Sequence, residues 1–77
     1  MCVVGLSEEE ERLRGLIEHW AHHNDEHRDR FLEAASKAEE LGLDEAAAEM
    51  KRAAGKAAEV SVHLRKALEH LRGRLLV

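Results

Sequence analysis

The sequence predicts an all-α protein, an antiparallel two-helix hairpin that dimerises into a four-helix bundle. Three observations predict this fold. Charged residues make up 36% of the 77 residues, proline is absent, and Ala, Leu, Glu, Lys and Arg dominate, a composition typical of long helices. Apolar residues recur every seven positions, as they do in supercoiled helices. No useful length of chain alternates polar and apolar residues as a half-buried strand would.

Size and charge limit the kinds of function. Seventy-seven residues fit a single domain. The net charge is −4, from 12 Lys+Arg and 16 Asp+Glu, and the absence of a basic face argues against a nucleic-acid partner. No apolar run approaches the ~20 residues that span a bilayer, so no membrane partner is expected. A single cysteine and no signal-peptide pattern favour a cytoplasmic protein.

The first helix is predicted over residues 7–41, after an apolar leader of residues 1–6. Ser7 followed by Glu10 is a capping-box pattern, and the acidic run 8–11 suits the positive end of a helix dipole. A seven-residue series then continues to the end of the helix, with its stripe centred on the direction of Trp20; its members are Leu13, Trp20, His27, Ala34 and Leu41.

A break at Asn24-Asp25 is the competing interpretation of this segment, and it would make three helices. Asn can end a helix and Asp can begin one. The seven-residue register runs through Asn24 without a slip, and this favours one unbroken helix.

The second helix is predicted over residues 44–73. Gly42 suits the left-handed residue that ends a helix, and Asp44 suits the N-cap of the next one. A second seven-residue series supports the helix; its members are Leu43, Met50, Ala57, Leu64 and Leu71. One hairpin leaves half of each apolar stripe facing water, so we expect a homodimer.

Four of the six histidines lie within nine residues, and they are the candidate site. His19, His23 and His27 follow i, i+4, i+8 spacing, so adjacent members lie on one side of the helix and can share a metal ion. His22 points to solvent at about 100° per residue. We therefore expect His23 and His27 to bind a metal, with His19 as an additional candidate ligand.

Folding the chain about Gly42 brings residues whose numbers sum to roughly 85 to the same level. This places Ser61 across from Asn24, and we expect Asn24, Ser61 or Glu26 to orient the imidazole rings. In a dimer, His23 and His27 of both chains supply four nitrogens, enough for nickel, cobalt, copper or zinc.

Two metal-free alternatives remain open. His27 and Asn24 can form a polar core layer that sets the register of an interaction module. Protonation of His27 can instead make assembly pH-responsive. An enzyme is not expected, because there is no phosphate-binding loop, no nucleophile triad and no pair of Glu-x-x-His motifs. Cys2, beside the terminal amine, is a separate candidate ligand, too far along the chain to share an ion with His23.

The run His19-Trp20-x-x-His23-Asn24-x-Glu26-His27, followed by Phe31 and Leu41-Gly42-Leu43, resembles an uncharacterised family of short histidine-containing helical hairpins from anaerobic prokaryotes. That family is associated with small nickel-binding proteins of the carbon monoxide dehydrogenase maturation type, which begin Met-Cys as this chain does. The resemblance implies nickel handling, a cysteine ligand at Cys2 and a metal-handling protein partner. The small β-domain of those nickel proteins is missing from this sequence.

Overall fold

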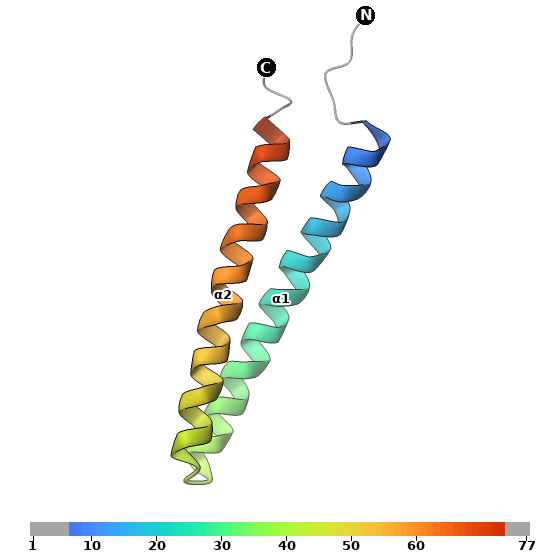
Figure 1. Ribbon diagram of the computed structural model, residues 1–77. Coiled ribbons are helices and arrows are strands. Elements are labelled where there is room, and N and C mark those ends of the chain that lie inside the picture. Colours follow the sequence, from blue (N-terminus) through green and yellow to red (C-terminus); the bar gives the residue numbers. More distant parts are fainter. Residues whose placement is uncertain (1–6, 74–77) are drawn as a thin grey trace, which may run out of the picture.

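The computed structural model describes residues 7–73, which form two antiparallel helices joined by a tight turn (Figure 1). Helix α1 spans Glu8–Glu40 and helix α2 spans Asp44–Gly73. The Cα atoms extend over 64 × 16 × 12 Å, so the molecule is a rod two helices wide and one helix thick. The predicted all-helical hairpin is confirmed, and the described residues contain no strand.

The N-terminus of α1 forms the predicted capping box. The Ser7 Oγ accepts a hydrogen bond from the Glu10 backbone N–H at 3.1 Å, and the Glu10 Oε1 accepts one from the Ser7 N–H at 2.9 Å. The two bonds satisfy backbone donors that have no partner within the helix. The helix then runs to Glu40 without interruption, so the alternative break at Asn24-Asp25 does not occur.

The turn between the helices is a Schellman motif. Gly42 has a φ of 75°, the left-handed conformation that glycine adopts without a steric penalty. The Leu43 N–H donates to the Ala38 carbonyl at 2.8 Å, and the Gly42 N–H donates to the Glu39 carbonyl at 3.0 Å. The expected N-cap at Asp44 is wrong by one residue, because the Leu43 carbonyl accepts the first bond of α2, from Ala47.

The seam between the helices consists mostly of alanine. Its buried side chains recur at spacings of three, four, seven and fourteen residues, all of which return to one face of a helix. They are, in order, Ile17, Ala21, Ala35 and Ala38 on α1 and Ala47, Ala54, Ala57 and Ser61 on α2. Alanine lets the two backbones approach closely, but it contributes little apolar area. The hairpin therefore has a thin core.

The stripe of α1 is not centred where the sequence predicts. Ile17, Ala21 and Asn24 face α2, whereas Trp20 lies beside the seam and keeps 48% of its surface exposed. Successive residues of a helix are about 100° apart, so His23 and Asp25 flank Asn24 and point to opposite edges of the hairpin.

The edge on the His23 side carries apolar and histidine side chains. We call it the Trp–His edge; its members are Leu13, Leu16, Trp20, His23 and His27. The opposite edge holds ion pairs that join the two helices, Asp25–Arg65 at 2.5 Å and Glu39–Lys51 at 2.8 Å. We call these four residues the ion-pair edge.

The described helices are too polar to form a membrane span: neither contains an apolar stretch of the length that crosses a bilayer.

Candidate metal site on the Trp–His edge

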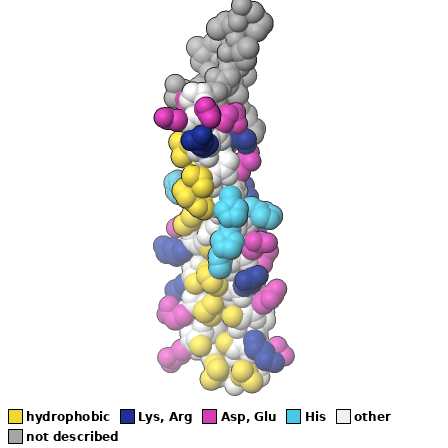
Figure 2. All heavy atoms as spheres, turned by 90° about the vertical axis from the view of Figure 1, so that its right-hand side faces the viewer, with side chains coloured by type: hydrophobic (Ala, Val, Ile, Leu, Met, Phe, Trp, Pro, Cys, Tyr) yellow, Lys and Arg dark blue, Asp and Glu magenta, His cyan; other side chains and the backbone are white. Residues whose placement is uncertain are grey.

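A ladder of rings runs along the Trp–His edge of α1. His19 and His23 stack with nearly parallel planes, 8° apart, and ring centroids 5.8 Å apart. His23 and His27 meet edge to face at 4.5 Å, and His27 stacks on Phe31 at 6.0 Å. Figure 2 shows histidine side chains gathered midway along this face, with hydrophobic side chains above and below them.

His23 and His27 turn the same nitrogen toward each other. Their Nε2 atoms are 3.0 Å apart, within hydrogen-bond distance. One ring donates its Nε2–H to the other, and the tautomers must therefore differ at that atom. Two adjacent imidazole nitrogens are also the minimum needed to chelate a cation.

The distance between these nitrogens can be compared with metal geometry. At metal–nitrogen distances of about 2.0–2.1 Å, two ligands at 90° have nitrogens about 2.8–3.0 Å apart, and two tetrahedral ligands about 3.3–3.4 Å apart. The observed 3.0 Å is the length of a hydrogen bond between the two rings, and it lies close to the separations of both arrangements.

Glu26 lies beside the histidine pair. Its Oε1 is 3.6 Å from the His23 Nδ1, and its Oε2 is 3.9 Å from the His22 Nε2. The first distance exceeds a hydrogen bond. Glu26 therefore lies next to His23, and its orienting role stays a prediction.

Asn24 and Ser61 have a different role from the one expected. The Asn24 Nδ2 donates to the Ala57 carbonyl at 2.5 Å and to the Ser61 Oγ at 2.9 Å. The Ser61 hydroxyl in turn donates to the Asp25 Oδ1 at 2.5 Å. Both side chains are thus committed to holding α1 against α2. They confirm the predicted register, in which residues 24 and 61 come level.

The sequence analysis did not predict the ion pair between Asp25 and Arg65. The Arg65 guanidinium donates to Asp25, and together with the Ser61 hydroxyl it lowers the pKa of that carboxyl to about 2. Because the chain has so many charged residues, the pair could have been predicted only from the register of the hairpin. Arg65 lies one helical turn beyond Ser61, which faces Asn24-Asp25.

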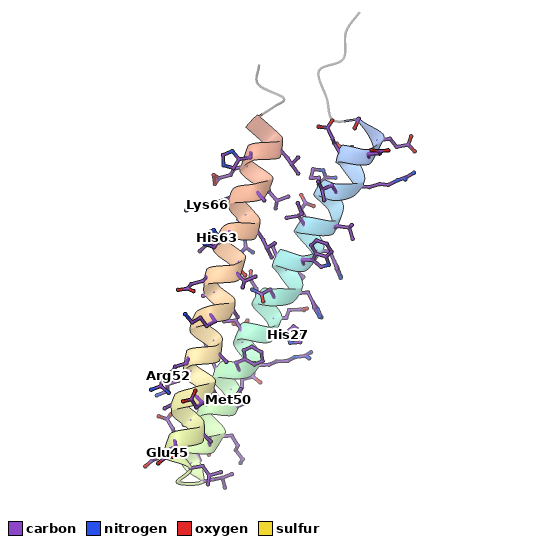
Figure 3. All side chains as sticks on the ribbon, viewed as in Figure 1. His27, Glu45, Met50, Arg52, His63 and Lys66 are labelled. Atoms are coloured by element: carbon purple, nitrogen blue, oxygen red, sulfur yellow. The ribbon has the colours of Figure 1, made fainter. Side chains whose placement is uncertain are left out.

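The remaining candidate ligands do not join His23 and His27. His19 stacks on His23, and the lone pairs of parallel stacked rings do not point to a common ion. His63 projects from α2 on the side of the hairpin opposite to His27 (Figure 3). Cys2 lies outside the described residues. Within residues 7–73, no group of three or more His, Cys, Asp or Glu side chains is arranged to hold a metal.

The described residues thus form a long, thin helical hairpin with a pair of histidines on one edge. Residues 13–71 match the family described as "Domain of unknown function (DUF8180)", and the chain belongs to this family. The match includes every histidine of the ladder. An uncharacterized protein of Archaeoglobus fulgidus is 46% identical over 59 residues, which cover 77% of this chain and 94% of the relative. No solved structure matches.

The comparisons confirm part of the resemblance noted in the sequence. The chain is a member of an uncharacterised family, as that resemblance implies. Its association with nickel proteins stays a prediction.

Proposed function

We propose that this protein is a non-enzymatic binder of a transition-metal ion, with His23 and His27 as the ligands of each chain. The observation that carries the proposal is the 3.0 Å separation of the two Nε2 atoms. Helical i, i+4 spacing alone brings two rings near each other, but it does not bring one particular nitrogen of each within 3.0 Å of the other. Glu26 lies beside the His23 Nδ1, where it would orient the ring for metal binding.

Two imidazoles leave a metal ion only partly coordinated. A second chain with the same pair completes four nitrogen ligands, and a four-helix bundle of two hairpins is the assembly that brings the pairs together. The exposed Trp20, Leu13 and Leu16 beside the pair support such an assembly, since they leave apolar surface to cover.

Nickel, cobalt, copper and zinc are the ions that a pair of imidazoles suits, because imidazole is a good ligand for all of them. The sequence resemblance adds weight to nickel and to a metal-handling protein as partner.

The experiment is a titration of metal-free protein with Ni²⁺, Co²⁺ and Zn²⁺, followed by native mass spectrometry and thermal unfolding. We expect one ion per two chains and a higher unfolding temperature with metal, since ligands that bind only the folded state stabilise it. His23→Ala and His27→Ala should each weaken binding by roughly 100-fold or more, because each removes half of the nitrogens.

His63→Ala is the matched control, since Glu59 and His63 have the same i, i+4 spacing on α2 but lie away from the pair. This variant should bind as the parent does. Absence of uptake at micromolar metal, or equal losses in His63→Ala and His27→Ala, would overturn the proposal.

A metal-free interaction module is the second candidate. It is favoured by the Asn24–Ser61 hydrogen bond at 2.9 Å, a polar layer of the kind that fixes register in helical bundles. This function predicts a dimer whose stability is the same with and without metal. A dimer that dissociates between pH 7 and pH 5, and no longer does so in His27→Ala, would favour the pH-responsive version.

A further inference from the structure

The geometry points to a particular partner for the Trp–His edge. We propose that a second copy of this chain docks there with its α1 antiparallel to the first α1, so that facing residues have numbers that sum to about 50. The inference rests on the proposed function for its choice of helices. It adds the direction, the register and the contacts of the dimer.

The exposed area of the chain is what a second copy would cover. The chain exposes 5970 Å², whereas a folded monomer of 8.7 kDa exposes roughly 4,700 Å². The excess, roughly 1,270 Å² by this scaling, is larger than the ~800 Å² that each partner loses in a standard interface, so the chain has surface enough for one. Among the large hydrophobic side chains that are exposed, Leu13, Leu16 and Trp20 lie together on the Trp–His edge and are each close to half exposed.

The Trp–His edge continues onto α2. Val60 and Val62 flank Ser61, so they point to opposite edges of the hairpin at about 100° per residue. Arg65 lies four residues after Ser61, on the Val62 side, and it pairs with Asp25 on the ion-pair edge. Val60 therefore lies on the same side of the hairpin as Trp20, and it is also about half exposed.

Contact between two α1 helices follows from the position of the ligands. Both histidines of each pair are on α1, so the two pairs meet only where α1 packs directly against α1 of the partner. If α1 packed against α2 of the partner, the pairs would lie at diagonal corners of the bundle. Neighbouring helices are already 8–10 Å apart, and diagonal ones are farther.

Charge decides the direction of this contact. Arg30 and Lys37 follow His23 at intervals of seven and fourteen residues, so both continue the Trp–His edge toward the turn. In a parallel pair each would face its own copy, and like charges that face each other are destabilising. In the antiparallel pair, with the histidines at the centre, Arg30 faces the partner's Trp20 and Lys37 faces the partner's Leu13.

The antiparallel contact also gives Arg30 a favourable neighbour. A guanidinium over an indole ring makes a cation–π interaction, and Trp is the strongest aromatic partner. Leu16 then faces the small Ala34 of the partner subunit, so a large side chain meets a small one. The long stem of Lys37 covers Leu13 while its ammonium reaches water.

The experiment uses engineered cysteines in the full chain with Cys2→Ser. Leu16→Cys combined with Ala34→Cys places the two thiols opposite each other across an antiparallel dimer, and they lie too far apart within one chain to bond. Diamide serves as the oxidant, because a copper oxidant would itself bind the histidines. Intact mass under denaturing, non-reducing conditions counts covalent dimers, and circular dichroism verifies that each variant is helical.

We expect most chains of the double variant to become covalent dimers. The single variants, Leu16→Cys and Ala34→Cys, should form no covalent dimer and should have the mass of one chain under denaturing conditions. Efficient cross-linking of Leu16→Cys alone would show a parallel dimer and overturn the proposal. A monomer by sedimentation at micromolar concentration, or a dimer in which the double variant does not cross-link, would also overturn it.

Metal uptake separates this inference from the proposed function. Cross-linking of the double variant without metal uptake by the Cys2→Ser chain would leave the dimer geometry standing and remove the metal. Uptake of one ion per two chains without cross-linking of the double variant would support the metal site and rule out the antiparallel dimer geometry.

Discussion

The two long edges of the hairpin differ in how far a single chain completes them. On the ion-pair edge, Asp25 meets Arg65 and Glu39 meets Lys51, so charges from both helices neutralise each other across the seam. On the Trp–His edge, the histidines meet one another, and Trp20 remains half exposed. The first edge fixes how α1 sits on α2, and the second leaves the histidine pair and a half-exposed tryptophan at the surface of the chain.

The two edges also differ in what stabilises them: ion pairs on one and large apolar side chains on the other. The ion-pair edge contributes direction and register more than energy, since exposed ion pairs are worth at most about 1 kcal/mol each. The Trp–His edge carries the large side chains that the alanine seam lacks. In the dimer proposed above, these side chains would contribute the apolar burial that the thin core of one hairpin does not supply.

The largest expected effect separates the two edges directly. Trp20→Lys should weaken the dimer by about 100-fold or more, because a central tryptophan is a typical interface hot spot and an ammonium there would face the like-charged Arg30 of the partner subunit. Leu32→Lys is the matched control: Leu32 is 46% exposed, close to the 48% of Trp20, and it is on α1 one turn beyond Arg28. Sedimentation equilibrium measures both dissociation constants.

Leu32 lies on the ion-pair side of α1, seven residues after Asp25, so its substitution should leave the dimer nearly unchanged. Equal losses in the two variants would mean that the partner does not distinguish the edges.

A smaller effect is expected where the seam meets the ion-pair edge. Ser61→Ala removes the acceptor of Asn24 and a donor to Asp25, and Ser61 is buried. We expect a loss of about 1–2 kcal/mol in the free energy of unfolding, because two part-buried hydrogen bonds between the helices are removed and each is worth about 0.5–1.5 kcal/mol. Urea denaturation at a fixed chain concentration measures it.

Ser36→Ala serves as the control for this variant, because Ser36 is an exposed residue of α1 and the substitution gives the same gain in helix propensity. A loss in Ser61→Ala no greater than in Ser36→Ala would show that the network contributes nothing to stability.

The smallest effect is a pH dependence on the ion-pair edge. The pKa of Asp25 is lowered to about 2, chiefly by hydrogen bonds from Arg65 and Ser61, whereas an unfolded Asp titrates near pH ~3.9. A lowered pKa stabilises the folded state above the unfolded pKa, and this stability is lost as the pH falls through the folded value. We expect a loss on the order of 1 kcal/mol between about pH 4 and pH 2, after allowance for solvent screening.

Thermal unfolding of the parent and of Asp25→Asn over this pH range isolates the effect, because the other carboxylates are common to both chains. The difference between the two should shrink as the pH falls. A difference that stays constant down to pH 2 would contradict a stabilising role for the ionised carboxylate.

Much of the fold follows from the sequence for local reasons. The capping box at Ser7, the left-handed Gly42 and the unbroken register through Asn24 each depend on a few neighbouring residues. The pairing of Asn24 with Ser61 follows from the position of the turn, since a rigid turn fixes which residues come level.

The choice of face could not be predicted from the sequence. Helix α1 carries two adjacent apolar stripes, one through Ile17 and Ala21 and the other through Leu16 and Trp20, and both fit a seven-residue repeat. The alanines of α1 decide the matter, because only small side chains let α1 approach the alanines of α2. The larger stripe, which sequence patterns favour as core, is the one left outside.

The tight turn has a consequence for the dynamics of the rod. Contacts near Gly42 close short loops and contacts near the chain ends close long ones, so opening should begin at the free ends and proceed toward the turn. In the antiparallel dimer proposed above, residue 41 of one chain lies beside residue 9 of the other. The part of each hairpin that opens least would then cover the part of its partner that opens most, and hydrogen exchange would become nearly uniform along the rod.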